Sequence, residues 1–263
     1  MKRLILAALL AAGAASASHA YDPLKAAIEG SQRVPANVAR DAARHPYETL
    51  SFFGIRPDMT VVELSPSGGW YTEILAPYLR DKGKLIGAAE EIKPENRYAM
   101  AFRKKLDSNP AVFDKVAVGL FEPGKQYNIA PAGSVDMVLT FRNMHNWIGI
   151  GDAKMNELLK AVHTTLKPGG VFGVVDHRLP ASIKQDERAS SGYVHEAWVI
   201  KTVEAAGFKL VAKSEVNANK RDTADHPRGV WTLPPSYAMK DVDREKYQAI
   251  GESDRMTLKF VKQ

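Results

Sequence analysis

The chain has 263 residues, with 36 lysines and arginines against 30 aspartates and glutamates, and its formal net charge is +6 at pH 7. The basic residues form short clusters, such as Arg103-Lys104-Lys105 and Lys220-Arg221, that are more typical of solvated faces than of nucleic-acid patches, so no nucleic-acid partner is expected. The sequence contains no cysteine, which excludes disulfides, thiolate nucleophiles and cysteine-ligated metals.

The first 20 residues have the pattern of a secretory signal peptide. Lys2 and Arg3 form a charged head, Leu4–Ala15 is an apolar run, and Ser18-His19-Ala20 is a small-x-small cleavage site. A transmembrane anchor is less favoured, because the apolar run is shorter than the ~20 residues that span a bilayer. We therefore expect cleavage after this site, export to the periplasm or the medium, and no membrane span in the mature chain.

Residues 21–263 are enough for one domain, in which we expect an N-terminal helical cap (21–59) and a long insertion (217–255). Three short helices are predicted in the cap: Asp22–Glu29, Ala36–Arg44 and Tyr47–Phe53. Pro46 suits the first position of the last helix and Gly54 suits its end. The cap also contains polar residues that either face a site or form a solvated helix face: Arg40, Arg44, His45 and Glu48.

A strand, a tight turn and a helix follow the cap and predict a binding site. The β-branched run Thr60–Leu64 predicts a strand, the small residues Ser65–Gly69 a turn, and the apolar periodicity of Thr72–Leu79 a helix. In open α/β sheets, ligands bind at the carboxyl ends of strands, where small residues let the backbone approach them. Neither a dinucleotide fingerprint nor a phosphate loop fits, because other residues occupy the glycine and lysine positions: Ser65, Ser67, Trp70 and Tyr71.

The turn has the spacing E-x-[small]-x-[small]-x-G, with Glu63, Ser65, Ser67 and Gly69 at the fixed positions. In this spacing the chain resembles the first motif of class I S-adenosylmethionine (SAM) dependent methyltransferases. It resembles more closely a family of predicted, exported methyltransferases whose loop reads E-L-x-P-x-G-G-W-Y-T-E-I-L-A-P-Y-L. Serines stand here where the class I motif usually has its first two glycines. The resemblance implies SAM as the cofactor, held by Glu63, Ser65, Ser67, Gly68 and Gly69.

The resemblance also implies the fold: an α/β, Rossmann-like seven-stranded sheet, mostly parallel with the last strand antiparallel, and helices on both faces. Further strands are predicted over Lys84–Ala89, Lys115–Gly119, Ser134–Phe141, Val171–Val175, Phe208–Val216 and Thr257–Val261. Further helices are predicted over Pro94–Asp107, Asp152–Leu166 and His195–Ala206. Gly124–Gly133 is predicted as a loop and Lys167–Gly170 as a turn. The long segment Asn217–Arg255 is either functional or disordered, and Trp231 favours a partly packed flap.

Three more cofactor contacts are implied by the resemblance. The acidic residue that binds the ribose hydroxyls falls on Ala89 by spacing, so Glu90 either takes this role with a shift of one residue or is simply exposed. Phe121 follows the third strand, where it either stacks on the adenine or packs in the core. Asn143 follows the central strand and is expected to contact cofactor or substrate through its amide or backbone.

His145 is the best candidate for a general base. Its ordinary pKa of about 6.5 suits proton removal near neutral pH, and it lies in a loop that follows the central strand. Alternatively, its ring is hydrogen-bonded only within that loop. Asp176 and His177 follow the next strand, and we expect them to position the substrate. Together with His195 they would give a metal site of two histidines and a carboxylate, but no tight histidine spacing favours this, and no metal is predicted.

The sequence therefore predicts an exported enzyme that transfers a methyl group from SAM to a small-molecule acceptor. A second hypothesis is a degenerate fold that binds a ligand or an envelope partner without catalysis. Three features favour the second hypothesis: the serines at glycine positions, the displaced ribose acid, and export from the compartment where SAM is made.

Overall fold

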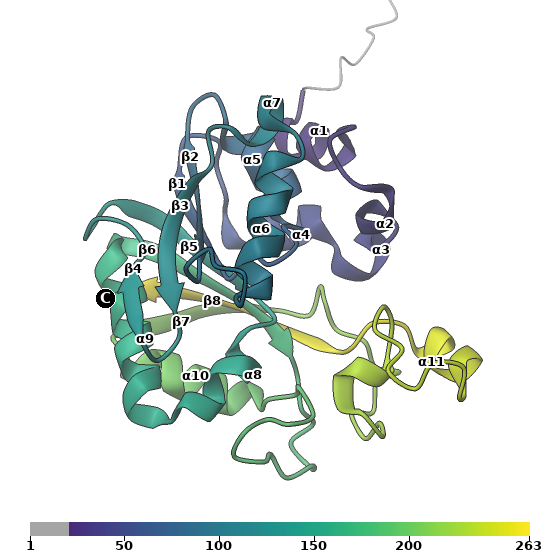
Figure 1. Cartoon of the computed structure of the whole chain (residues 1–263). Coiled ribbons are helices and arrows are strands. Elements are labelled where there is room, and N and C mark those ends of the chain that lie inside the picture. Colours follow the sequence, from purple (N-terminus) through teal and green to yellow (C-terminus); the bar gives the residue numbers. More distant parts are fainter. Residues whose placement is uncertain (1–20) are drawn as a thin grey trace, which may run out of the picture.

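A computed structural model describes residues 21–263, so the predicted signal peptide lies outside the described residues (Figure 1). The described residues contain an eight-stranded sheet in the order β4-β3-β2-β1-β5-β6-β8-β7. The strands are β1 (Thr60–Leu64), β2 (Lys84–Ala89), β3 (Ala117–Glu122), β4 (Gln126–Asn128), β5 (Val135–Phe141), β6 (Leu166–His177), β7 (Phe208–Ser214) and β8 (Arg255–Lys262). The chain order reverses between the neighbours β1 and β5, and ligands of open α/β sheets bind at such a switch point.

The strand directions confirm the predicted fold class. The strands β3, β2, β1, β5 and β6 run parallel, and β8 runs antiparallel between β6 and β7. The sheet has one strand more than predicted, because β4 pairs antiparallel with β3 inside the segment predicted as a loop, Gly124–Gly133. Three residues are too few to show a strand periodicity, and Gly124, at φ +75°, makes the turn that precedes them.

The predicted turn Lys167–Gly170 lies inside β6 and not before it. Val135 of β5 pairs with Leu166, whereas Met137 pairs with Val171, so the four residues between Leu166 and Val171 leave the ladder as a bulge. Gly169 takes φ +72° in this bulge, a conformation that glycine adopts without steric cost. The strand therefore begins five residues earlier than its apolar run indicates.

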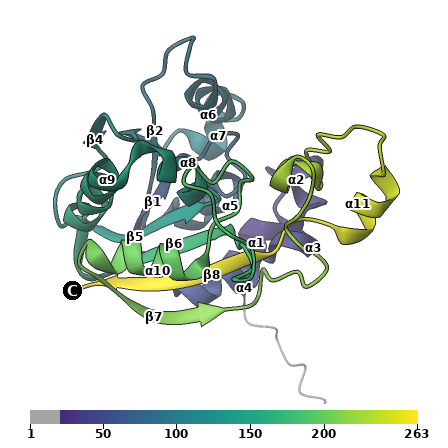
Figure 2. The same ribbon diagram turned by 90° about the horizontal axis from the view of Figure 1, so that it is seen from below.

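Helices cover both faces of the sheet (Figures 1 and 2). One face packs against α1 (Pro23–Glu29), α4 (Pro46–Phe53), α5 (Thr72–Leu79), α6 (Arg97–Asp107) and α7 (Pro110–Phe113). The other face packs against α8 (Met144–Trp147), α9 (Asp152–Thr165) and α10 (Glu196–Ala205). Successive residues of β1 point to opposite faces, so Val61 joins the first core and Val62 the second. Burial on both sides explains the continuous apolar run of this strand.

The N-terminal segment differs from its prediction at one point. The helix predicted over Ala36–Arg44 is two short helices, α2 (Pro35–Val38) and α3 (Asp41–Arg44). The break frees Arg40 to bind Glu252, with its Nε 2.6 Å from Oε1, so a tertiary ion pair takes precedence over helix continuity. α4 begins at Pro46 and ends at a Gly54 with φ +80°, as predicted.

The segment 217–255 contains η2 (Gly229–Thr232) and α11 (Arg244–Ile250), and it lies beside α2 and α3 (Figure 2). Its centre is the buried carboxylate of Asp222, which accepts hydrogen bonds from the Tyr193 hydroxyl at 3.0 and 3.1 Å. The same carboxylate accepts from the backbone amide of Asp254 at 2.8 Å, and its Oδ1 lies 2.8 Å from Nε2 of His226. The segment is therefore fixed to the loop before α10 and to the start of β8.

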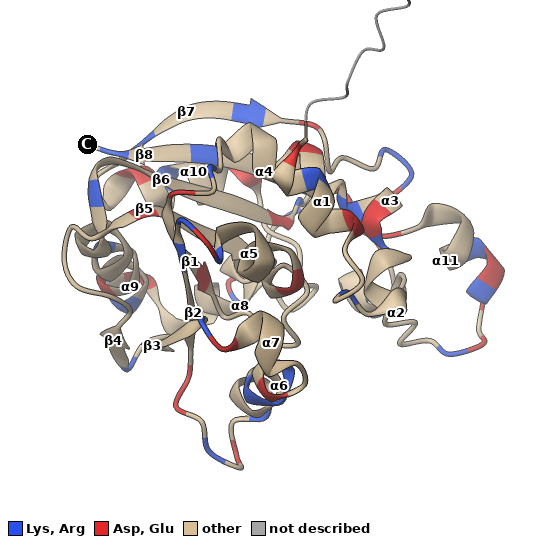
Figure 3. Ribbon diagram, turned by 90° about the horizontal axis from the view of Figure 1, so that it is seen from above, with Lys and Arg blue, Asp and Glu red and all other residues tan. Residues whose placement is uncertain are grey.

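Basic and acidic residues alternate over several elements (Figure 3). On α6, Arg103 pairs with Asp107 at 2.5 Å, and Lys105 pairs with the buried Glu73 at 2.5 Å. Two cations of the longest basic run are thus matched by carboxylates. Among residues 21–263, no helix combines the length and apolar character needed to cross a membrane.

Candidate active site

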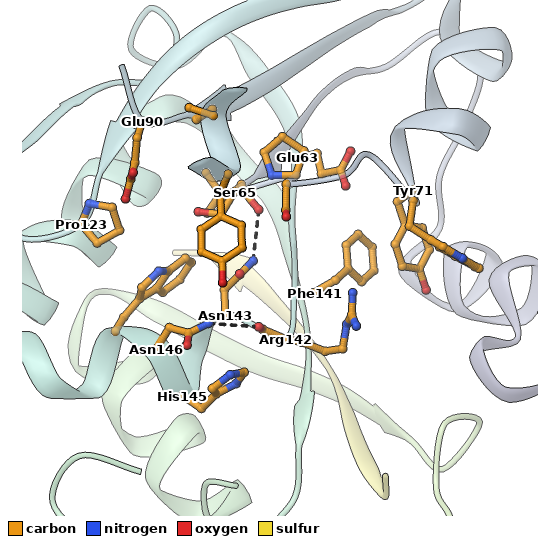
Figure 4. A pocket seen from close by; sticks show the side chains of 18 of the residues that line it. Glu63, Ser65, Tyr71, Glu90, Pro123, Phe141, Arg142, Asn143, His145 and Asn146 are labelled. Carbon is orange, nitrogen blue, oxygen red and sulfur yellow. Dashed lines mark hydrogen bonds between the residues drawn. The ribbon is translucent and has the colours of Figure 1, made fainter. Parts of the chain in front are cut away.

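A cavity of about 600 Å³ opens at the switch point between β1 and β5 (Figure 4). This volume lies within the range of small-molecule and cofactor sites. Glu63 and Ser65 stand on one side and His145 on the other, with Asn143 and Arg142 between them. The wall therefore combines the ends of β1, β2 and β5 with the start of α8.

The turn after β1 alternates between ordinary and left-handed residues. Ser65, Ser67 and Gly69 have φ values of 48°, 52° and 72°, which explains the motif's requirement for a small residue at every second position. At Gly69 a Cβ atom would also lie 2.7 Å from Cγ of Lys105, so steric crowding and backbone conformation both require glycine there. The two serines hold a conformation that costs about 1–2 kcal/mol per non-glycine residue, and such strain concentrates at functional sites.

The same turn leaves backbone donors available. Its ends are tied by bonds from the Ser65 amide to the Ala88 carbonyl, 2.8 Å, and from the Gly69 amide to the Pro66 carbonyl, 2.9 Å. The amides of Ser67 and Gly68 donate to no acceptor within residues 21–263. Ser65 and Ser67 line the cavity, whereas Gly68 is exposed beside it and Gly69 is buried behind it. The turn thus fits a ligand that approaches bare backbone.

Glu63 is buried at the end of β1 and lines the cavity. Its Oε2 accepts a hydrogen bond of 2.6 Å from the Thr72 hydroxyl of α5. Burial raises the pKa of Glu63 to about 8, against the smaller, opposing effect of the Thr72 hydrogen bond. The carboxyl group of the free protein is therefore largely protonated at neutral pH, and a cationic ligand group beside it would favour its ionisation.

Asn143 ties the two strands at the switch point together. Its side-chain amide donates to the Leu64 carbonyl at 3.2 Å and to the Thr140 hydroxyl at 3.1 Å. Both bonds fix the start of α8 against β1. The residue lines the cavity, but its amide hydrogens are used within the protein.

His145 and Asp176 form a buried pair. Nδ1 of His145 lies 2.8 Å from Oδ1 of Asp176, and the His145 backbone amide donates to Oδ2 at 3.1 Å. Asp176 has no exposed surface, lies behind the cavity wall, and also accepts from the His177 amide at 2.7 Å. Because the carboxylate occupies Nδ1, the ring nitrogen Nε2 is the one left for a ligand. A carboxylate that orients an imidazole in this way is a common arrangement for a general base.

His177 lies beside this pair and lines the cavity. Its ring centroid is 5.1 Å from that of His145, and its Nδ1 is 2.5 Å from the Ser253 hydroxyl. Burial holds the pKa of His177 well below its ordinary value, and the charge of Arg142 acts in the same direction, so the ring is neutral.

Ligand atoms of His145, Asp176 and His177 lie within 4.8 Å of one another, which is close enough for a metal ion. His195 is not part of this group, because its Nε2 bonds to the Ile183 carbonyl at 2.8 Å. Arg142, Arg255 and Arg44 all act electrostatically on His177, and their positive charge disfavours a divalent cation there. The three residues therefore fit a proton-transfer site better than a metal site.

Of the other two predicted cofactor residues, Glu90 lines the cavity wall and Phe121 lies in the core. Glu90 and Ala89 both line the cavity at the end of β2. Phe121 does not line it: the side chain has no exposed surface and packs 5.2 Å from Trp147 and 5.7 Å from Tyr127, so it offers no face to an adenine ring. The extra strand β4 supplies Tyr127 and so completes the burial of Phe121.

Among the cavity residues that were not predicted, Arg142 and Trp231 matter most for the site. Arg142, directly after β5, lines the wall in the left-handed conformation, φ 63°, which is unusual for a long side chain. Its position after a buried strand was the available signal. Trp231 reaches the wall from the segment 217–255, with its ring 6.3 Å from that of His145. No local pattern in the sequence places a residue so far along the chain at this site.

No protein-family model matches this chain, and no curated protein matches it in sequence. Solved structures with a similar fold include a SAM dependent methyltransferase from Aquifex aeolicus, with a TM-score of 0.55 and 19% identity over 92% of this chain and 98% of that one. Geranyl diphosphate C-methyltransferase from Streptomyces coelicolor gives a TM-score of 0.57 and 13% identity, covering 90% and 88%. The [4+2]-cyclase SpnF gives 0.54 and 14%, covering 91% and 92%. The chain thus has the Rossmann-like fold of SAM-dependent methyltransferases.

Proposed function

We propose that this protein binds SAM and transfers its methyl group to a small-molecule acceptor. The observation that carries the proposal is a single cavity with two different walls. One wall is the strained turn Ser65–Gly69 after β1, and the other is the His145–Asp176 pair after β5. The fold shared with SAM-dependent methyltransferases supports this assignment.

The wall formed by the turn suits the cofactor. Ser65 and Ser67, with the free amides of Ser67 and Gly68, would hold its polar groups against the backbone. Glu63 would face a cationic or hydroxyl group, and Glu90 at the end of β2 would take the ribose hydroxyls. When bound, SAM supplies a methyl group that its sulfonium makes electrophilic.

The opposite wall suits the acceptor. Nε2 of His145 is available to remove a proton from an acceptor hydroxyl or amine, while Asp176 holds the Nδ1 proton and stabilises the resulting imidazolium. Trp147 and Trp231 line this region and give it an aromatic surface. Positioning contributes roughly 7–11 kcal/mol to such reactions, whereas a general base adds ~10²–10⁴-fold, so His145 would accelerate the reaction without being indispensable.

A second candidate is a ligand-binding protein without catalysis. Serines at the left-handed positions 65 and 67, where the class I motif usually has glycine, favour it. The orienting contact between Asp176 and His145 favours the enzyme, because pure binding does not require an imidazole held in one tautomer.

The pattern of the first 20 residues supports the further proposal that the protein is exported and processed. Expression of the whole chain in a Gram-negative host, followed by N-terminal sequencing of the periplasmic protein, tests it. A mature N-terminus at Tyr21 is expected, and an unprocessed chain in the cytoplasm would contradict it.

Calorimetric titration of the purified protein with SAM and S-adenosylhomocysteine separates the two candidates. We expect micromolar binding of both that Gly69→Val abolishes, because a side chain there meets Lys105 and cannot adopt φ 72°. Gly169→Val is the matched control: its φ is also 72°, but it lies in the bulge of β6 with open space around its Cβ position. If neither nucleoside binds the parent protein, methyl transfer is excluded.

Incubation with methyl-labelled SAM and a panel of small hydroxyl, amine and carboxylate compounds then identifies the acceptor. Tight nucleoside binding without label transfer to any compound favours the non-catalytic candidate. Transfer that depends on His145 favours the enzyme.

A further inference from the structure

Four arginines gather behind one side of the cavity. Arg40 directly precedes α3 and Arg44 is its last residue. Arg142 follows β5, and Arg255 begins β8. We refer to these four residues as the arginine cluster. α3 lies against the start of β8, where the Arg255 side chain donates to the Ala43 carbonyl.

One carboxylate serves three of these cations. Glu252 binds Nε of Arg40 at 2.6 Å, Nε of Arg44 at 3.3 Å and Nη1 of Arg255 at 3.2 Å. These cations lower the pKa of Glu252 to about 2, although its burial acts in the opposite direction, so Glu252 is fully ionised. The arginine cluster nevertheless keeps an excess of positive charge.

Within residues 21–263, several donors of the arginine cluster have no hydrogen-bond partner. Arg44 is 2% exposed, and neither its Nη1 nor its Nη2 has a hydrogen-bond partner. The same holds for Nε of Arg255. The Arg142 guanidinium lines the cavity and makes no hydrogen bond or ion pair with any of residues 21–263. Unpaired buried donors of charged groups are costly, and a bound anion would remove part of that cost.

Arg142 lines the cavity, and the rest of the arginine cluster lies behind its aromatic wall. The guanidinium carbon of Arg44 lies 4.7 Å from the ring centroid of Trp70, whose side chain lines the wall. Beside it, Tyr71 stacks on Phe141 with the centroids 3.5 Å apart, and both rings line the same wall. In Figure 4 the Arg142 side chain extends toward Phe141 and Tyr71 and away from His145.

The cavity is therefore electrically asymmetric. Carboxyl groups of Glu63 and Glu90 lie at the ends of β1 and β2, on the side assigned to the cofactor. Arg142 follows β5 and lies between these carboxyl groups and His145, and the rest of the arginine cluster lies behind the aromatic wall. A cationic ligand group suits the side of the carboxyl groups and an anionic one suits the side of the arginine cluster.

We propose that Arg142, with Arg44 and Arg255 behind it, binds an oxyanion group of the acceptor, a carboxylate or a phosphate. That the anion belongs to the acceptor rests on the proposed function, but the oxyanion site itself does not depend on it. A guanidinium without protein partners presents a planar fork of donors that matches both groups. Bound in this way, the acceptor would have its reactive atom held near His145.

Benzoate, phenyl phosphate and the uncharged benzamide are suitable probes for calorimetry on the protein saturated with S-adenosylhomocysteine. We expect one of the two anions to bind at least about tenfold more tightly than benzamide, because a charge-assisted pair contributes more than ~1.4 kcal/mol. The preferred anion distinguishes a carboxylate acceptor from a phosphate acceptor. Equal binding of all three probes would overturn the proposal.

Arg142→Gln should abolish the preference for the anion, and Arg142→Lys should restore part of it. Arg103→Gln is the control, since Arg103 is an exposed residue of α6 paired only with Asp107. The affinity for S-adenosylhomocysteine should change less than about threefold in Arg142→Gln. The affinity of Arg142→Gln for S-adenosylhomocysteine could instead fall tenfold or more while its affinity for 5′-methylthioadenosine, which lacks the carboxylate, stays constant. In that case the arginine cluster binds the cofactor and the inference is wrong.

The two proposals fail in different ways. If S-adenosylhomocysteine does not bind the parent protein, the proposed function fails, and the three probes are titrated into the free protein. An anion preference that depends on Arg142 would then still establish the oxyanion site. If neither experiment shows an anion preference, there is no oxyanion site.

Discussion

The carboxylate of Asp176 fixes His145 at two points, through the ring nitrogen Nδ1 at 2.8 Å and through the backbone amide at 3.1 Å. The double contact sets the ring orientation and the start of α8 together. Since Asp176 ends β6 and His145 follows β5, the pairing of two parallel strands determines the position of the proposed base. The geometry of the pair thus depends on the sheet and not on the flexibility of a loop.

Replacing His145 should affect turnover far more than cofactor binding. With the acceptor from the labelling screen, we expect His145→Ala to lower kcat by ~10²–10⁴-fold, the usual contribution of a general base. The affinity for S-adenosylhomocysteine should stay within about threefold. His163→Ala is the control, because His163 lies on α9 against Phe208, away from the cavity. Equal losses of kcat and affinity in His145→Ala would remove His145 from the role of base.

Asp176→Asn tests the orienting contact separately. The amide keeps the shape of the carboxylate but can turn an N–H toward Nδ1, which would place the imidazole proton on Nε2 and block it as an acceptor. We expect kcat to fall by ~10²-fold or more and the pH at which activity rises to change, since the imidazolium loses its stabilising charge. A pH–rate profile that matches the parent protein would show that Asp176 has only a structural role.

The parts of the site that lie next to strand ends were predictable, and the parts that depend on tertiary packing were not. Glu63 and His177 lie at the ends of buried apolar strands and His145 comes shortly after one. The apolar runs of these strands are visible in the sequence, and parallel strands bring their ends to one edge. Trp231 reaches the same cavity through the contact between Tyr193 and Asp222, and no periodic pattern encodes such a contact.

Remote or short neighbours decided the position of Phe121, for which the sequence left two roles open, and made the helix predicted over Ala36–Arg44 wrong. Phe121 lies in the core because the three-residue strand β4 covers it, and a strand of that length leaves no periodic signal. The helix over Ala36–Arg44 breaks because Arg40 binds Glu252, which is more than 200 residues away in the sequence. Local propensity cannot register a partner at that distance.

Glu63 should make the free protein less stable as the pH rises. Its pKa is about 8 in the folded state against an ordinary 4.5, so between these values the folded state binds more protons than the unfolded one. The contribution is complete below about pH 4.5 and is lost as the pH rises through about 8, with a slope of up to about 1.4 kcal/mol per pH unit. Urea unfolding between about pH 5 and pH 8 measures this slope.

Glu63→Gln should flatten the pH dependence of the unfolding free energy, because glutamine cannot ionise. Glu157→Gln, at an exposed position on α9, should leave it unchanged. A parent protein whose unfolding free energy rises over this range would show that Glu63 is ionised in the folded state.

The two serines of the turn should carry strain that glycine relieves. We expect Ser67→Gly to leave stability unchanged or to raise it by up to about 1 kcal/mol, because the relief of the left-handed conformation offsets the added flexibility of the unfolded chain. Ser51→Gly, inside α4, should instead destabilise by roughly 0.5–1 kcal/mol. Thermal unfolding of both variants gives the comparison. A loss of S-adenosylhomocysteine binding in Ser67→Gly, with stability retained, would assign the hydroxyl itself to the cofactor.

The two ends of the cavity should respond separately to mutation. Tyr98 lines the end beside Glu90 and is 55% exposed, whereas Trp231 lines the end beside His145 and is 41% exposed, so neither truncation leaves a hole in the core. Tyr98→Ala should weaken S-adenosylhomocysteine about tenfold, the loss expected for an aromatic contact, and leave the acceptor KM unchanged. Trp231→Ala should raise the acceptor KM by a similar factor and leave nucleoside affinity unchanged, because it removes only the aromatic cover from the side of His145. If both variants weaken the nucleoside equally, the cavity holds one ligand along its whole length, and the division between cofactor and acceptor sides is incorrect.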